Sequence, residues 1–153
     1  GVHDFVVAPS ESIAGGCGEP RQMVWVIDIT DETTPFGVGT YTPREADSAF
    51  CTRGGRFGTH SSNESFAPVF YKRAMFFAAF NAGVRAVDFR DPYHPLEVGH
   101  YIPAVTGNTG GGVIQTNNVE IDERGYIYTV DRAGTGLHIL ELTGDARKLM
   151  AAP

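Results

Sequence analysis

The stretch Gly83 to Tyr101, GVRAVDFRDPYHPLEVGHY, constrains the fold most strongly, because much of it occurs twice in the chain. When Asp28 is aligned with Asp88, 60 positions later, seven of the sixteen residues that end at Pro43 and Pro103 are identical. They include an Asp and a Pro in a turn and a Val-Gly-x-Tyr motif in the strand that follows. A repeat at this period is the signature of a propeller or of another array of stacked units.

The sequence around this repeat predicts an all-β fold, a β-propeller of four-stranded antiparallel blades. Three blades are visible, in units that span residues 1–43, 58–103 and 113–144, with connectors at 44–57 and 104–112. In the first unit the strands expected from the inner to the outer one are Phe5–Ala8, Ser12–Cys17, Met23–Ile29 and Phe36–Tyr41. One blade cannot bury both of its faces alone, so blades must stack around an axis.

This chain alone should not close the ring. The last blade is incomplete, because the residues after Leu142 lack the Asp-Pro turn and the Val-Gly-x-Tyr strand. Propellers typically have four to eight blades. We therefore expect another chain, or the missing part of the same polypeptide, to complete the propeller, and we expect an oligomer or part of a complex.

Two segments, GVRAVDFRDPYHPLEVGHY and NNVEIDERGYIYTVDRAGTGLHILEL, resemble the units of the LVIVD-repeat proteins. The resemblance covers nearly the whole chain outside the two connectors. It implies a bacterial or archaeal β-propeller outside the cytoplasm, in the periplasm, at the cell surface or secreted. The family offers no agreed catalytic motif to carry over. His residues at the starts of inner strands give a more distant similarity to the selenium-binding protein (methanethiol oxidase) propellers.

The charge and the hydropathy of the sequence argue against two classes of protein, those that bind nucleic acid and those that cross a membrane with an apolar helix. The net charge is −6, and no basic run or stripe is present, which argues against a nucleic-acid partner. No apolar run is long enough for a transmembrane segment. The two cysteines are Cys17 and Cys51. They either form one disulfide in an oxidising compartment or remain two unrelated thiols in a reducing one. The disulfide is the favoured interpretation.

The candidate binding residues lie where inner strands are expected to begin, because these ends converge at one mouth of the central channel. They are His3, Asp4, His60, Asn63, Glu64, Asn117 and Asn118. Imidazole and carboxylate groups suit a divalent or transition metal ion, so His3, His60 and Glu64 are candidate metal ligands. The alternative is that these polar residues only line a channel and cap strand ends, with no cofactor.

The repeated acids Asp28, Asp31, Asp88 and Asp91 are interpreted as turn residues, because an Asp before a turn accepts backbone N–H bonds. With no catalytic constellation, the sequence favours a binding or scaffold module that contacts proteins or ligands through one face or the channel mouth. One alternative is a metal-dependent enzyme, an oxidoreductase or hydrolase with its site at the channel mouth. Another is a structural subunit of a larger assembly.

Overall fold

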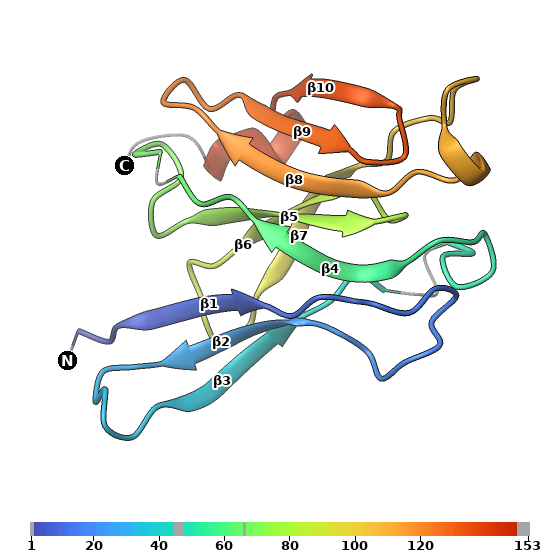
Figure 1. Cartoon of the computed structure of the whole chain (residues 1–153). Helices are drawn as coiled ribbons and strands as arrows, with labels where there is room; N and C mark the ends of the chain where they lie inside the picture. The colour runs from blue at the N-terminus through green and yellow to red at the C-terminus, as the bar shows by residue number, and fades with distance from the viewer. Residues whose placement is uncertain (1, 45–47, 66, 150–153) are drawn as a thin grey trace.

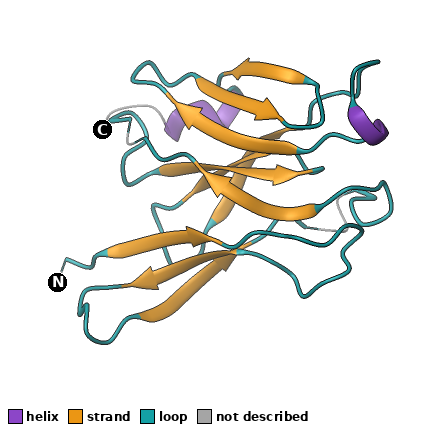
Figure 2. Cartoon of the chain, in the orientation of Figure 1, coloured by secondary structure: helices purple, strands orange, loops and turns teal. Residues whose placement is uncertain are grey.

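The computed structural model describes residues 2–44, 48–65 and 67–149, and its regular secondary structure consists mainly of short antiparallel strands (Figure 1, Figure 2). The all-β prediction is therefore confirmed. The first three strands form a separate sheet, which we call unit one: β1 (Phe5–Pro9), β2 (Val24–Asp28) and β3 (Phe36–Tyr41). Both neighbouring pairs in this sheet are antiparallel.

The remaining strands belong to one sheet of seven strands. Unit two is its first part, the meander β4 (Phe57–Ser62), β5 (Ala74–Phe80), β6 (Val84–Asp88) and β7 (Leu96–Tyr101). Unit three is its second part, β8 (Thr116–Ile121), β9 (Ile127–Asp131) and β10 (Gly136–Leu140). The single pair Phe80–Thr116 joins the two parts. Figure 1 shows unit two between unit one and unit three.

Two short 3₁₀ helices complete the described secondary structure, η2 (Gly110–Gly112) before β8 and η3 (Gly144–Leu149) after β10. Leu149 of η3 is buried in the core. Among the described residues, no helix has both the length and the apolar character needed to cross a membrane.

Units one and two repeat each other even in an irregularity of the backbone. The β2–β3 ladder shifts register between Val26 and Ile27, and the β6–β7 ladder shifts between Ala86 and Val87. The alignment of Asp28 with Asp88 equates these positions. The two ladders therefore share a bulge at equivalent positions of the sequence alignment.

The order of strands within unit one differs from the prediction. Phe5 of β1 pairs with Asp28, just as Ala74 of β5 pairs with Asp88. β1 is therefore the counterpart of the second strand, and no described strand of unit one takes the place that β4 has in unit two. The prediction that Phe5–Ala8 is an inner strand is wrong.

Residues Ser12–Cys17, predicted as the second strand, do not form one. Only Gly15 makes a β-bridge, to Arg56, and Gly16 and Cys17 have φ values of 59° and 58°. Such left-handed backbone is incompatible with an extended strand. The small residues of this segment therefore specify a turn.

Two apolar clusters hold the units together. Between units one and two, Val24 and Tyr41 pack with Phe77 and Val87, all of them buried. Between units two and three, the cluster contains Phe70, Phe76, Val119, Ile121 and Ile127. Units one and three each bury one face in this way and unit two buries both of its faces, as expected for stacked sheets.

A disulfide joins Cys17 to Cys51, with 5.2 Å between the two Cα atoms, so the favoured prediction for the cysteines is confirmed. Cys17 lies in residues 10–23, which connect β1 to β2 and which we call the strap. Only residues 81–83 connect the corresponding strands β5 and β6. The strap therefore reaches from unit one to unit two, where the Ser12 and Gly16 N–H groups also donate to backbone carbonyls.

A buried arginine adds a polar link between the same two units. Arg85 on β6 is 1% exposed and donates from Nη1 to Glu97 Oε1 at 2.9 Å. The hydroxyl of Tyr41, which comes from β3 of unit one, donates to the other oxygen of Glu97. Arg85 also donates from Nε to the Ala82 carbonyl. The carboxylate of Glu97 therefore offsets a buried charge and holds the end of β3.

Candidate functional site

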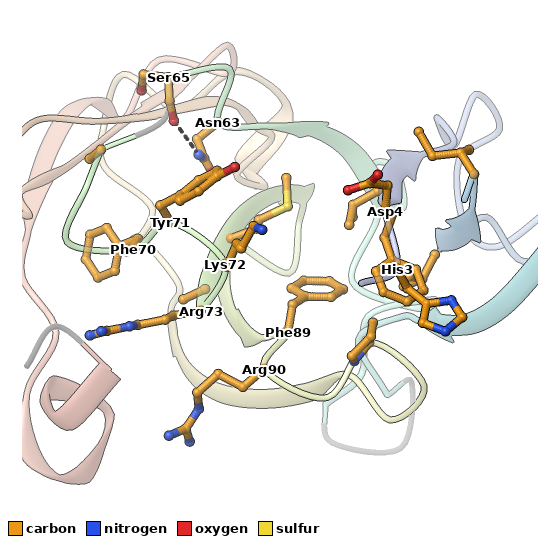
Figure 3. Close-up of a pocket in the computed structure, with 18 of the residues that line it drawn as sticks. His3, Asp4, Asn63, Ser65, Phe70, Tyr71, Lys72, Arg73, Phe89 and Arg90 are labelled. Atoms are coloured by element: carbon orange, nitrogen blue, oxygen red, sulfur yellow. Dashed lines mark hydrogen bonds between the residues drawn. The ribbon is translucent and has the colours of Figure 1, made fainter. Parts of the chain in front are cut away.

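A groove of about 1030 Å³ lies between units one and two, at the end of the sheets where β1 begins. Figure 3 shows His3 and Asp4 on one wall, and Asn63, Ser65 and Tyr71 on the other. Three of the seven predicted binding residues, His3, Asp4 and Asn63, line this groove. The other four, His60, Glu64, Asn117 and Asn118, lie outside its lining.

His3 is tied to the turn that follows β2. Its Nδ1 lies 2.9 Å from Asp28 Oδ2 and 3.3 Å from Thr30 Oγ1, while half of its side chain remains exposed. The side chain and the backbone N–H of Thr30, and to a lesser degree His3, hold the pKa of Asp28 below its ordinary value. His3 can therefore present only its Nε2 side to a ligand.

Asp4 is exposed, and its carboxylate faces the groove in Figure 3. Its backbone N–H donates to Thr30 Oγ1 and its carbonyl accepts from the Ile29 N–H. These bonds fix its backbone and leave the carboxylate as a negative group on the wall of the groove.

The side chain of Asn63 is buried and forms hydrogen bonds with the backbone. Its Oδ1 accepts from the Phe76 N–H at 2.8 Å, and its Nδ2 donates to the Ser65 carbonyl at 2.9 Å. Glu64, the next residue, is exposed, and its backbone N–H donates to Glu120 Oε1. The two neighbours thus differ: the Asn63 side chain connects β4 to β5, and the Glu64 side chain points to solvent.

The structure brings His60 and Asn117 together on the inner strands β4 and β8. His60 Nε2 lies 3.1 Å from Asn117 Oδ1, which also accepts from Arg132 Nη1 at 3.4 Å. Because this oxygen accepts from Arg132, we assign a donating proton to His60 Nε2. Asn117 Nδ2 in turn donates to Asn118 Oδ1. The structure therefore brings together three of the seven predicted residues, His60, Asn117 and Asn118.

The other side of His60 meets the strap. Glu11 Oε1 accepts from Arg56 Nη1 at 3.0 Å and lies 3.5 Å from His60 Nδ1, within ion-pair range but without hydrogen-bond geometry. Glu11 follows β1, Arg56 precedes β4 and Asn117 lies on β8, so the cluster draws residues from all three units. We call Glu11, Arg56, His60, Asn117 and Arg132 the axial cluster.

The ring of Phe80 supports the axial cluster. His60 stacks on it at 4.7 Å, and the guanidinium groups of Arg56 and Arg132 lie 5.5 Å and 4.9 Å from its centroid. Phe80 is fully buried and has a φ of 48°, which is costly for an aromatic residue. The axial cluster thus combines hydrogen-bond donors with two guanidinium cations. The side-chain oxygens of Glu11 and Asn117 already accept hydrogen bonds within it.

The predicted metal ligands are not grouped. In residues 2–44, 48–65 and 67–149, no three His, Cys, Asp or Glu side chains are placed to hold a metal ion. His3 is bound to Asp28 in unit one, and His60 lies in the axial cluster. Glu64 is exposed beyond the end of β4.

The repeated acids fix turns, as the sequence predicts. Asp28 and Asp88 each accept at Oδ1 from the N–H two residues later, at 2.8 Å and 2.9 Å, and Asp31 and Asp91 do so at 3.0 Å. Asp122 accepts in the same way from Arg124. Hydrogen bonds lower the pKa of all five carboxyl groups.

Sequence reasoning did not select Glu11, Arg56 or Arg132 as binding residues. A signal for Arg56 exists, because residues 56, 58 and 60 alternate along one strand direction and therefore share a face with His60. For Glu11 there is no local signal, since the strap brings it to His60 from another unit. Its position depends on the fold of residues 10–23.

A search of protein-family models and a search of curated proteins each find no match for this chain.

Proposed function

We propose that this chain is a binding and scaffold module, a segment of an LVIVD-type β-propeller outside the cytoplasm whose ring a partner polypeptide completes. The observation that carries this proposal is that each of the two outermost units lacks a described counterpart of one strand of unit two. Among the described strands, unit one has no counterpart of β4 and unit three has no counterpart of β7. Each outermost unit thus offers a place for further β-structure.

The free faces of these units support the proposal. On unit one, Val6 and Trp25 are 42% and 44% exposed and lie on the face turned away from unit two. On unit three, Leu137 and Ile139 are both 60% exposed on the corresponding outer face. Paired, alternating apolar residues on a sheet face are typical of a surface that packs against another sheet.

The location outside the cytoplasm rests on two arguments. The Cys17–Cys51 disulfide is typical of proteins in oxidising compartments, and the segments around the repeat resemble extracytoplasmic LVIVD units. Nothing in this proposal requires catalysis. The groove and the axial cluster would be binding surfaces of the completed ring.

Sedimentation equilibrium of the intact chain tests the proposal. We expect a mass above the 16.5 kDa of one chain, because the outer faces associate when no other partner is present. Leu137→Lys should weaken this association about tenfold or more, since a buried unpaired charge is costly. The control is Val105→Lys, a substitution of an equally exposed residue in the second connector. Equal effects of the two substitutions would contradict the proposal.

A further inference from the structure

We propose that the free edge of β1 is a docking site for an extended strand of a second polypeptide, which adds antiparallel to β1 as β4 adds to β5. This inference rests on the proposed function and specifies how the partner binds. Strand addition to an exposed edge is a general mode of peptide recognition, in which main-chain hydrogen bonds provide the affinity.

The backbone of β1 has one occupied edge and one open edge. The Asp4 carbonyl accepts from Ile29 and the Ser10 N–H donates to Met23, so the even-numbered residues face β2. Because hydrogen-bonding groups alternate along an antiparallel strand, Phe5 and Val7 direct their N–H and C=O groups the other way. Along Phe5–Pro9, no described strand other than β2 pairs with β1.

Unit two shows what occupies the equivalent edge. With Phe5 aligned to Ala74, Val7 corresponds to Phe76. The Phe76 carbonyl accepts from the Asn63 N–H at 3.1 Å, and its N–H donates to Asn63 Oδ1 at 2.8 Å. At Val7 both of these groups are left for a partner. A residue like Asn63 at the end of the added strand would pair with both.

The groove extends an interface that the chain already forms. Phe5 and Val7 line the groove, and Val7, Met75 and Phe89 also pack against the buried cluster between units one and two. Figure 3 shows Phe89 at the base of the space between the Asp4 wall and the Asn63 wall. A strand on β1 would therefore continue this apolar packing toward Asn63.

The chemistry of the partner strand follows from the two inner strands present. β4 and β8, FGTHSS and TNNVEI, are short and rich in polar residues with Asn or His on the side of the axial cluster. Pro9 has no N–H, so it contributes only a carbonyl to the pairing. The partner is therefore a short polar strand that pairs mainly with Phe5 and Val7.

The test uses the intact chain and a synthetic peptide with the sequence of residues 57–65, which contains β4 and Asn63. We expect the peptide to slow amide hydrogen exchange at Phe5 and Val7, measured by NMR. Val7→Pro removes one edge donor that the β2 ladder does not use, so the chain should fold and bind the peptide about tenfold more weakly. Val2→Pro, outside the strand, is the matched control and should bind normally.

Three results would overturn the inference: no protection of Phe5 and Val7, equal binding by Val7→Pro, or amides already protected in a monomeric chain without peptide. If Val7→Pro does not fold, exchange at the Phe5 and Val7 amides of the unmodified chain decides the question alone. An assembly above 16.5 kDa with unprotected Phe5 and Val7 amides would end this inference but leave the proposed function standing.

Discussion

At the residue scale, Asn63 and Glu64 illustrate how neighbours in a polar segment acquire different roles. The side chain of Asn63 satisfies the buried N–H of Phe76, and Glu64 is exposed. Asn63→Ala leaves that N–H without a partner and should lower the free energy of unfolding by about 1–3 kcal/mol, measured by urea denaturation.

Glu64→Ala is the matched control and should change the free energy of unfolding by no more than about 0.5 kcal/mol. If Asn63→Ala is as mild as this control, the structural role assigned to Asn63 is wrong.

The turn acids predict a specific loss of stability in acid. Desolvation raises the pKa of Asp122, but hydrogen bonds from Arg124, Tyr126 and Tyr128 outweigh it and lower that pKa from 3.8 to about 2. A carboxyl group with a lowered pKa in the folded state stabilises the fold above its unfolded pKa and loses this effect as the pH falls. The stabilisation by Asp122 should therefore decline as the pH falls from 3.8 through about 2.

Thermal unfolding of Asp122→Asn and of the unmodified chain across this range measures the effect. The difference in Tm should be largest above the ordinary pKa and should vanish only below the folded-state pKa of about 2. Glu123→Gln, at the exposed next position, is the control. A difference in Tm that does not change with pH would contradict the assignment.

Some of the candidate site could be predicted because the repeat aligns it. His60 and Asn117 were selected as inner-strand residues of two units, and their side chains meet. His3 was selected by the same reasoning, but it pairs with Asp28 because β1 is not an inner strand. A single sequence contains no signal that Glu11 meets His60, since this contact depends on the path of the strap.

At the scale of elements, the strap has no counterpart in the other units. It carries Cys17 and Glu11 to unit two, where the connector provides Cys51 and β4 follows. Replacing both cysteines by Ser should lower the free energy of unfolding by about 2–4 kcal/mol, because the unfolded chain gains freedom. Unfolding with and without a reductant measures this change.

The double variant should unfold identically with and without reductant, and the reduced unmodified chain should match it. If the reductant destabilises the double variant as well, the effect does not come from the Cys17–Cys51 bond.

The sequence predicted the outer halves of units one and two correctly because the Asp, Pro and Val-Gly-x-Tyr positions fix the register of β2 with β3 and of β6 with β7. It failed for β1 because an apolar run shows that a strand forms but not which neighbour it pairs with. Because the strap separates β1 from β2, the sequence does not indicate that these two strands pair as β5 and β6 do across the short connection at residues 81–83. A local sequence pattern does not indicate which distant segments of the chain pair with each other.

At the scale of the whole molecule, the three units stack with unit two in the middle (Figure 1). Apolar side chains remain exposed on both outer faces. Each contact between units buries a cluster of aliphatic and aromatic residues. Trp25 and Leu137 lie on faces that could form the same kind of contact with further units. The unpaired strand edges and the exposed faces of the two outer units support the proposal that a partner completes this fold.

The mass of the native chain in solution tests this claim most directly. Sedimentation equilibrium should find a discrete assembly heavier than 16.5 kDa, which Leu137→Lys dissociates and Val105→Lys does not. A stable monomer of 16.5 kDa, unchanged by either substitution, would contradict the account.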